Sequence, residues 1–222
     1  MPVPTSPAPE EARRRARAIL GRLKKRYPLA GTALEYREPW QLLVATVLSA
    51  QTTDANVNRV TPRLFARWPA PEDLAEADPE EVEAVVHSTG YYRQKARSII
   101  SLSADLVARF AGEVPTDMAA LTGLRGVGRK TASVVLAEAF GSPAIAVDTH
   151  VGRISRRLGL SGHTDPAKVE ADLRALYSRR EWAGISMRFI LFGREVCTAR
   201  RPRCGACPLA DRCPYPGKNP AG

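Results

Sequence analysis

All four cysteines of the chain lie within seventeen residues of one another. They are Cys197, Cys204, Cys207 and Cys213, and six, two and five residues separate them in turn. Disulfides between residues so close in sequence would not staple a fold, whereas four thiolates at this spacing can surround one metal centre. The spacing suits both a zinc ion and an iron–sulfur cluster. We therefore predict a metal site formed by these four residues.

The segment between the first two cysteines, residues 198–203, is strongly basic. It contains Arg200, Arg201 and Arg203 together with a stiffening proline, Pro202. A metal centre that holds this loop in place would present the three guanidinium groups to phosphates with little further loss of entropy. The alternative is a structural clip that only ties down this part of the chain.

The sequence Leu-Arg-Gly-Val-Gly-Arg-Lys-Thr-Ala, residues 124–132, has the pattern of a tight turn followed by a helix. Gly126 and Gly128 allow backbone angles that a Cβ would forbid, and they leave peptide N–H groups open to approach. The first N–H groups of a helix lack partners and its dipole favours anions, so a DNA phosphate could bind at this turn. Val127 and Arg129 lie in the same turn. The alternative is a plain helix connection with glycine caps.

Lys130 lies two residues after Gly128, in the first turn of the expected helix. The chain has six lysines and twenty-seven arginines, so an amine at this place is unusual. An amine can form a Schiff base with a sugar aldehyde carbon, whereas an always-protonated guanidinium cannot. Lys130 is therefore a candidate nucleophile. Its alternative role is that of a solvated lysine that contacts one phosphate.

Asp148, in the sequence Ala-Val-Asp-Thr-His, directly precedes another expected helix. Aspartate is a favoured N-cap residue at such a position. Its carboxylate could also accept a proton or stabilise a cationic sugar in a reaction at Lys130. The two roles are compatible, and the sequence leaves both open.

The overall charge favours a polyanionic partner. The 222 residues include 33 Lys and Arg against 23 Asp and Glu, which gives a formal net charge of +10. This balance favours nucleic acid over an acidic membrane surface. No apolar run approaches the roughly 20 residues of a membrane span, and the Arg-rich first segment lacks the apolar region of a signal peptide. We expect an intracellular protein that does not associate with membranes.

The candidate residues lie on or between segments with helical periodicity. We find no alternating strand pattern and no long repeat, and we predict an all-α fold of about ten helices. In the first segment, residues 10–27, one face carries Ala16, Ile19, Leu20 and Leu23. The expected helices cover residues 10–27, 39–51, 54–68, 71–77, 79–88, 93–112, 116–124, 129–141, 149–160, 166–178 and 181–196.

Local signals mark the ends of several of these helices. Pro71 and Pro79 stand at first helical positions, and Gly112 ends the longest expected helix. After residues 141–143, a β-branched stretch leads into the next helix. This break is either a domain boundary or a bend within one domain.

Taken in order, these motifs closely resemble those of the endonuclease III family. The matching stretches are Ser-Ala-Gln-Thr-Thr-Asp at residues 49–54, the glycine turn with Lys130, the Asp148 motif and the cysteine spacing. The resemblance runs from about Ala12 to Cys213, which is nearly the whole chain. It implies an all-α fold in which two helical domains flank a DNA-binding cleft.

The resemblance also implies how the chain divides. An iron–sulfur cluster domain would join residues 10–31 to residues 142–213. A six-helix domain with the helix-hairpin-helix motif would cover residues 32–141. Residues 1–9 and 214–222 are rich in proline and glycine, and we expect a disordered leader and tail there.

Members of the family are DNA glycosylases that also cleave abasic sites and carry a [4Fe–4S] cluster. The resemblance implies a bifunctional glycosylase and AP lyase of base excision repair, which removes oxidised pyrimidines from duplex DNA. Lys130 matches the nucleophile, which attacks C1′ of a flipped nucleotide and forms a Schiff base before β-elimination. Asp148 matches the catalytic carboxylate, and the four cysteines match the cluster ligands. We expect a cytoplasmic, nucleoid-associated monomer whose partner is double-stranded DNA containing damaged pyrimidines or abasic sites.

The family also fills the gap that the flipped nucleotide leaves. Gln51 matches the residue that enters the gap, and Tyr91 occupies the place of an intercalating wedge. His150, in the Asp148 motif, and the residues of the glycine turn are implied to bind DNA as well. The loop arginines at positions 200, 201 and 203 complete the expected DNA-binding set.

The chain departs from the family pattern at several of these places. Tyr91 stands where leucine is usual, and this change affects the expected preference for the opposite base. Arg125 replaces the usual proline of the glycine turn, which adds charge near the DNA and loosens the turn. Gly152 and Arg156 also differ from the side chains expected after the Asp148 motif.

Three other functions are compatible with parts of the pattern. An adenine-specific mismatch glycosylase would carry a non-nucleophilic residue in place of Lys130 and a glutamate in the helix over residues 39–51, which contains no carboxylate. A thymine-mismatch glycosylase is disfavoured by the same lysine. A non-catalytic DNA-binding protein would keep the hairpin and the cluster for positioning only, and substitution of Lys130 distinguishes it from an enzyme.

Overall fold

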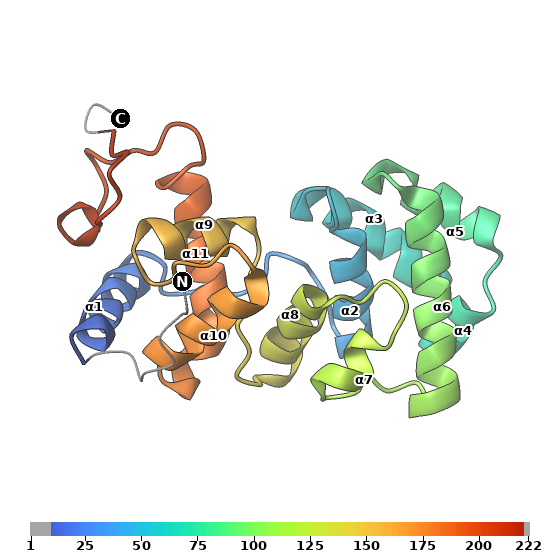
Figure 1. Ribbon diagram of the computed structural model, residues 1–222. Coiled ribbons are helices and arrows are strands. Elements are labelled where there is room, and N and C mark those ends of the chain that lie inside the picture. The colour runs from blue at the N-terminus through green and yellow to red at the C-terminus, as the bar shows by residue number, and fades with distance from the viewer. Residues whose placement is uncertain (1–9, 220–222) are drawn as a thin grey trace. The chain divides into compact units, whose positions relative to one another are not determined.

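The computed structural model describes residues 10–219, which form eleven α-helices and three short 3₁₀ helices. No strand occurs over this range, so the all-α prediction is confirmed (Figure 1). No helix in it is long and apolar enough to cross a membrane. The expected leader at residues 1–9 and the last three residues of the expected tail lie outside the described range.

The chain folds into two compact units, and the break between them falls after Ser142. Unit 1 combines residues 10–31 with residues 143–219, and unit 2 is Thr32–Ser142. Unit 1 therefore contains the beginning and the end of the described chain, and unit 2 is one continuous stretch.

Unit 2 is built around a buried helix, α2. Eight of the ten residues of α2 are buried, as its nearly uniform apolar sequence predicts. It packs against α8, while the long helix α6 packs against α4 and α5 (Figure 1). The helices of this unit are α2 (Pro39–Leu48), α3 (Asp54–Arg67), α4 (Pro71–Ala75), α5 (Pro79–Val86), α6 (Tyr92–Phe110), α7 (Met118–Thr122) and α8 (Arg129–Phe140).

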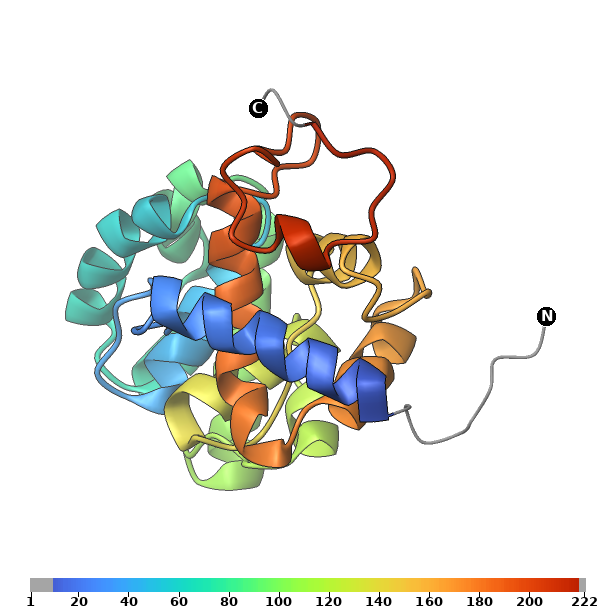
Figure 2. The same cartoon turned by 90° about the vertical axis from the view of Figure 1, so that its left-hand side faces the viewer.

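Unit 1 contains α1 (Glu10–Arg26), α9 (Thr149–Arg157), α10 (Pro166–Leu176) and α11 (Trp182–Glu195). Figure 2 shows α1 lying across α11, against which α9 also packs. The buried face of α1 is the predicted set of Ala16, Ile19, Leu20 and Leu23. These four side chains join the core of the unit beside fully buried residues of α11 such as Phe189.

Local signals placed helix beginnings well and helix ends less well. Pro71 and Pro79 are first helical residues, as predicted. Helix α2 ends at Leu48, three residues before the predicted end, because Gln51 adopts a left-handed conformation with φ of 56°. Tyr91, before α6, is likewise left-handed, with φ of 49°. Both residues therefore sit in turns between helices.

Candidate functional site

The glycine turn joins α7 to α8 in unit 2 and forms a helical hairpin. The carboxylate of Asp117 caps α7 by accepting a hydrogen bond from the N–H of Ala120 at 2.8 Å. Gly126 has φ of +78°, and a Cβ there would stand 2.8 Å from the Cβ of Ser98 on α6. The fold thus requires glycine at this position, both for its backbone angles and for its close approach to α6.

Gly128 is different, because no contact with the described residues requires a glycine there. It is the N-cap of α8 with φ of −84°, and a Cβ added to it would meet no atom of residues 10–219 within 4 Å. No side chain caps this helix, so the N-terminus of α8 is open. The side chain of Val127 is buried, so only its backbone can face a ligand. An open, uncapped helix N-terminus suits an anion such as a phosphate.

Lys130 lies in the first turn of α8, directly beside this open N-terminus, and its side chain is exposed. Arg129 and Arg125 in the same turn are exposed too. The turn therefore combines an uncapped helix N-terminus with three cationic side chains. Such a combination can hold a phosphate and bring an amine close to the adjoining sugar.

Asp148 belongs to unit 1, where it is the N-cap of α9. Its Oδ1 accepts a hydrogen bond from the N–H of Val151 at 2.8 Å, so the capping role that the sequence allowed is real. Of its two carboxylate oxygens, only Oδ1 takes part in a hydrogen bond among the described residues of unit 1. One oxygen thus holds the helix, and the other is available for a proton or a substrate.

Helix α9 also holds the loop between the first two cysteines. Arg153 donates through Nη2 to the carbonyl oxygen of Cys197 at 3.1 Å and lies 3.1 Å from Nδ1 of His150. Arg157 donates to the carbonyl oxygens of Thr198 and Ala199, each at 2.7 Å. The helix that Asp148 caps is therefore the helix that fixes the basic loop.

The four cysteines are partly buried, form no disulfide and line one pocket of unit 1. Apolar side chains, including those of Leu158, Phe192 and Val196, complete much of its wall. The N–H of Leu209 donates to Sγ of Cys207 at 3.4 Å, and burial raises the pKa of that thiol. Four thiols around one apolar pocket are a donor set that fits an iron–sulfur cluster.

Cationic groups surround this pocket as well. Arg157, Arg203 and Lys218 line it, and Nη1 of Arg157 lies 3.4 Å from Sγ of Cys197. A cluster held by four thiolates brings negative charge, which these cations offset, and N–H···S hydrogen bonds tune its reduction potential. Both the four thiols and the positive charge around the pocket therefore fit an iron–sulfur cluster.

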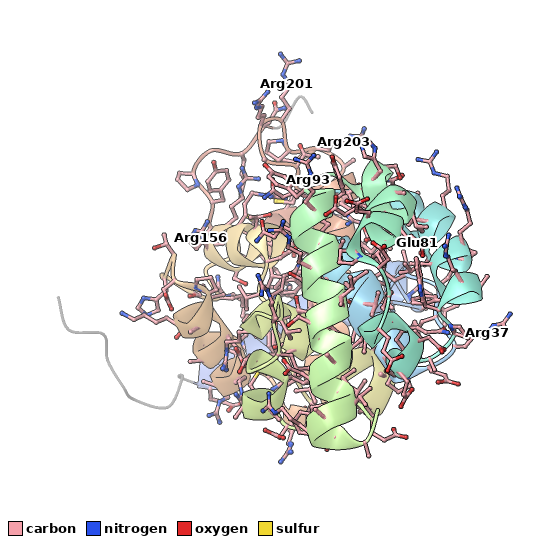
Figure 3. The ribbon with its side chains drawn as sticks, turned by 90° about the vertical axis from the view of Figure 1, so that its right-hand side faces the viewer. Arg37, Glu81, Arg93, Arg156, Arg201 and Arg203 are labelled. Carbon is pink, nitrogen blue, oxygen red and sulfur yellow. The ribbon has the colours of Figure 1, made fainter. Side chains whose placement is uncertain are left out.

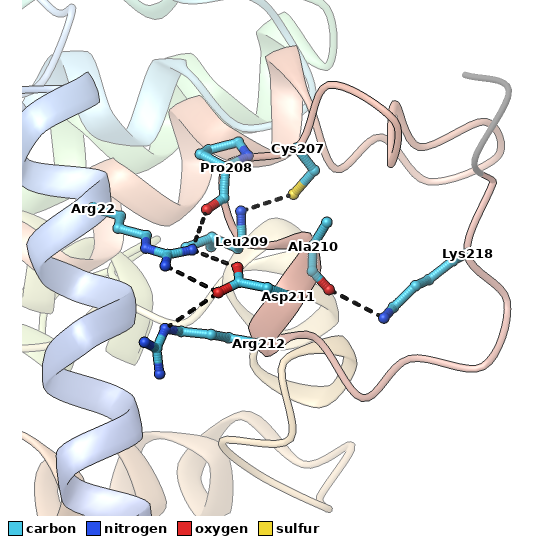
Figure 4. Close-up of polar contacts among 8 residues, drawn as sticks. All are labelled: Arg22, Cys207, Pro208, Leu209, Ala210, Asp211, Arg212 and Lys218. Carbon is cyan, nitrogen blue, oxygen red and sulfur yellow. Dashed lines mark hydrogen bonds and ion pairs between the residues drawn. The ribbon is translucent and has the colours of Figure 1, made fainter.

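Helix α1 anchors the other side of the cysteine segment (Figure 4). Arg22 donates to the carbonyl oxygen of Pro208 at 2.7 Å and to both carboxylate oxygens of Asp211, at 2.5 and 3.0 Å. Hydrogen bonding to this guanidinium lowers the pKa of the Asp211 carboxyl. Lys218 donates to the carbonyl oxygen of Ala210 at 3.1 Å. The segment from Cys207 to Cys213 is thus tied to α1 and to the residues after it.

The three loop arginines are exposed, as expected of groups that bind phosphates. Figure 3 shows Arg201 extending outward from the tip of the loop, with Arg203 nearer its base. The buried Pro202 lies between them, and the N–H of Arg203 donates to the carbonyl oxygen of Val196 at 2.9 Å. The loop backbone is therefore held from inside while its cationic side chains face solvent.

Gln51 and Tyr91 lie in two loops of unit 2. Gln51 is exposed, and Tyr91 is 65% exposed, an unusual state for a large aromatic side chain. Each is one of the three non-glycine residues with positive φ in the described range. Exposed groups on strained turns are typical of ligand-binding positions.

The structure thus sorts the predicted residues into two groups. Gly126, Gly128, Arg129, Lys130, Gln51 and Tyr91 belong to unit 2, whereas Asp148, His150, the loop arginines and the cysteines belong to unit 1. Sequence reasoning missed Arg22, Arg153 and Arg157. For the latter two there was a signal, since they are four residues apart on the helix that follows Asp148 and so share a face.

Comparison with known proteins identifies two matching families. A sequence model described as the HhH-GPD superfamily base excision DNA repair protein matches residues 44–179. A second, described as the iron-sulfur binding domain of endonuclease III, matches residues 197–213. The second match covers the whole cysteine segment.

Individual relatives agree with these models. Endonuclease III of Synechocystis is 52% identical over 203 residues, which are 91% of this chain and 93% of that protein. Endonuclease III of Escherichia coli K12 is 41% identical over 200 residues, 90% and 95% of the two chains. The solved structure of a trapped endonuclease III–DNA covalent intermediate has a TM-score of 0.87 and 46% identity, and the match covers 91% of this chain and 95% of that one.

Proposed function

The chain belongs to the endonuclease III family, and from this premise we propose that Lys130 and Asp148 carry out its chemistry. The protein is a DNA glycosylase and AP lyase of base excision repair that removes oxidised pyrimidines from duplex DNA. It carries a [4Fe–4S] cluster. We propose the four cysteines as its ligands.

The position of Lys130 is the observation that carries the proposal. Its amine is exposed in the first turn of α8, beside a helix N-terminus that neither a side chain nor a Cβ obstructs. A phosphate bound at that N-terminus brings the adjoining deoxyribose toward the amine. The turn therefore orients the sugar for attack, which is the part of catalysis that positioning supplies.

The reaction begins when the damaged nucleotide leaves the base stack, which exposes its C1′. The neutral amine of Lys130 attacks C1′ as the bond to the base breaks, and the departing base takes up a proton. The C1′–O4′ bond then opens, and O4′ takes up the proton that the Lys130 nitrogen loses. The resulting protonated imine between Lys130 and C1′ makes the C2′ protons acidic. Loss of one such proton then expels the 3′ phosphate by β-elimination.

Asp148 is suited to the proton transfers and to the positive charge that develops on the sugar. One of its oxygens is committed to capping α9, so its orientation is fixed, and the other is available. A carboxylate oriented in this way can take a proton from the Lys130 nitrogen once that nitrogen has bonded to C1′, and it can stabilise the cationic sugar.

The proposed DNA contacts extend beyond the hairpin. Gln51 and Tyr91 would fill the gap in the duplex, and the arginines of the basic loop would bind backbone phosphates. His150 lies in the first turn of α9, next to the carboxylate. The cluster is capable of electron transfer when bound, and we assign it the role of holding the loop rather than a bond-breaking step. An enzyme of genomic DNA would reside in the cytoplasm with the nucleoid.

Borohydride trapping on a duplex containing thymine glycol tests the proposal. The native chain should form a covalent adduct with the DNA, and Lys130→Ala should form none while still binding. Lys168→Ala is the matched control, because Lys168 is also an exposed lysine in the first turn of a helix. An adduct that persists in Lys130→Ala, or that disappears in Lys168→Ala, would show that Lys130 is not the nucleophile.

The same experiment also tests the alternative that the chain is a non-catalytic DNA-binding protein. Such a protein would bind the lesion duplex tightly and give no adduct even with the native sequence. The loss of Lys130 would then weaken binding by one phosphate contact only.

A further inference from the structure

Two loops of unit 2 carry the residues proposed to enter the duplex. The Gln51 loop, residues 49–53, joins α2 to α3, and the Tyr91 loop, residues 87–91, joins α5 to α6. Both contain a non-glycine residue in the left-handed region. Backbone of this kind persists only where the surrounding structure supports it.

Asn56, in the first turn of α3, connects the two loops. Its Nδ2 donates to Oγ1 of Thr52 in the Gln51 loop at 3.1 Å and to the carbonyl oxygen of Ser88 in the Tyr91 loop at 2.8 Å. Its Oδ1 accepts from Nη2 of Arg59 at 3.2 Å. Both N–H bonds of the amide are thus used, one on each loop, and the third contact fixes the orientation of the amide.

The Tyr91 loop is also held from its other side. Nζ of the buried Lys95 donates to the carbonyl oxygen of Thr89 at 2.7 Å. The consecutive carbonyl groups of Ser88 and Thr89 are therefore bound by side chains from two different helices, α3 and α6. Lys95 ties the Tyr91 loop to α6, whereas Asn56 ties it to the Gln51 loop.

We propose that Asn56 is a positioning residue that sets the separation of Gln51 and Tyr91, so that both side chains enter the duplex at the same base pair. This inference rests on the proposed insertion of these two residues. A flipped nucleotide leaves one gap, and two side chains from separate loops can fill it only if their spacing is fixed beforehand. An error of about 1 Å in such positioning costs large factors in rate.

The chain contains a matched control two residues away. Nδ2 of Asn58 donates to the carbonyl oxygen of Ala33 at 2.8 Å, and Oδ1 accepts from the N–H of Glu35 at 3.1 Å. Asn58 is therefore an asparagine on the same helix as Asn56, with a similar set of hydrogen bonds, but these bonds go to neither loop. Any general effect of losing an asparagine from α3 should appear in Asn58→Ala.

The experiment compares Asn56→Ala, Asn58→Ala and the native protein in three assays. The first is single-turnover excision from a thymine glycol duplex. The second is cleavage of a single-stranded abasic oligonucleotide, which has no stack to open. The third is the fluorescence of 2-aminopurine opposite a tetrahydrofuran abasic analogue in duplex DNA at saturating protein. Tetrahydrofuran cannot form the imine, so this signal needs no chemistry.

We expect Asn56→Ala to excise about tenfold more slowly from duplex DNA and to keep near-native cleavage of the single strand. Its 2-aminopurine signal should move toward that of the free duplex, since the side chains no longer enter the gap together. Asn58→Ala should match the native protein in all three assays. Thr52→Val, which removes only the acceptor on the Gln51 loop, should change the same readings in the same direction even if Asn56→Ala folds poorly.

Native behaviour of Asn56→Ala and Thr52→Val in the duplex assays would overturn the inference. So would an equal loss in Asn58→Ala, or an equal loss on single-stranded DNA, because both would indicate a general effect. Failure of the proposed function is a separate result. It would appear as no cleavage and no trapping by the native protein, and the 2-aminopurine comparison would still decide the role of Asn56.

Discussion

The two glycines of the hairpin turn should respond to the same substitution in opposite ways. Gly126→Ala places a Cβ on a backbone with φ of +78° and 2.8 Å from the Cβ of Ser98. Gly128→Ala places a Cβ on a backbone with φ of −84°, with no atom of the described residues within 4 Å. The first change disturbs the fold, and the second disturbs only what approaches from outside.

The expected magnitudes follow from these contacts. A left-handed alanine costs about 1–2 kcal/mol, and forcing α6 aside costs about 1–3 kcal/mol more, so Gly126→Ala should lower the free energy of unfolding by about 2–5 kcal/mol. For Gly128→Ala, alanine is a poorer N-cap than glycine but has lower entropy in the unfolded chain, so the net change should stay within about 1 kcal/mol. The methyl group would, however, keep a phosphate from the helix N-terminus. Loss of hydrogen bonds to a charged group should weaken DNA binding about tenfold to a hundredfold.

Denaturant unfolding and binding to a duplex with a tetrahydrofuran site measure both quantities. Gly162→Ala is the control, because a Cβ at Gly162 also meets nothing within 4 Å and the residue lies outside the hairpin. DNA affinity of Gly128→Ala within twofold of the native value would refute phosphate binding at α8. Native stability of Gly126→Ala would refute the assignment of that glycine to the fold.

Three further predictions concern unit 1. Asp148→Asn keeps a good helix cap, so the free energy of unfolding should change by less than about 1 kcal/mol. Single-turnover excision should nevertheless fall by about a hundredfold or more. A loss of activity that is fully explained by a loss of stability would contradict a catalytic role. Cys207→Ser should reduce the visible absorbance of the cluster together with folding or DNA binding, and a folded, tightly binding but inactive variant would contradict a purely structural cluster. Arg22→Ala, which releases Pro208 and Asp211, should speed the loss of cluster absorbance in the presence of an iron chelator, and an unchanged rate would show that α1 does not hold this segment.

The sequence determined the features that depend on neighbouring residues. The buried face of α1 could be read from spacing alone, because residues three and four apart share one side of a helix. Pro71 and Pro79 marked helix beginnings because proline lacks the N–H that such a position leaves unused. The cysteines could be assigned to one site because all four lie in a short segment, at a spacing that lets four thiolates surround one metal centre.

Tertiary structure decided the features that depend on distant residues. Arg22 is 189 residues from Asp211, and no local pattern pairs them. The open face of Gly128 and the crowded face of Gly126 look alike in sequence, since only the packing of α6 against the turn distinguishes them.

The link between the Gln51 and Tyr91 loops is of the same kind. Asn56 reads in the sequence as one polar residue on an amphipathic helix, and its role depends on the carbonyl of Ser88 arriving from 32 residues away. Helical periodicity and capping are set by interactions within a few residues, so a sequence displays them directly. Which side chain meets which distant carbonyl depends on how the helices pack, and that packing is settled only when the whole core forms.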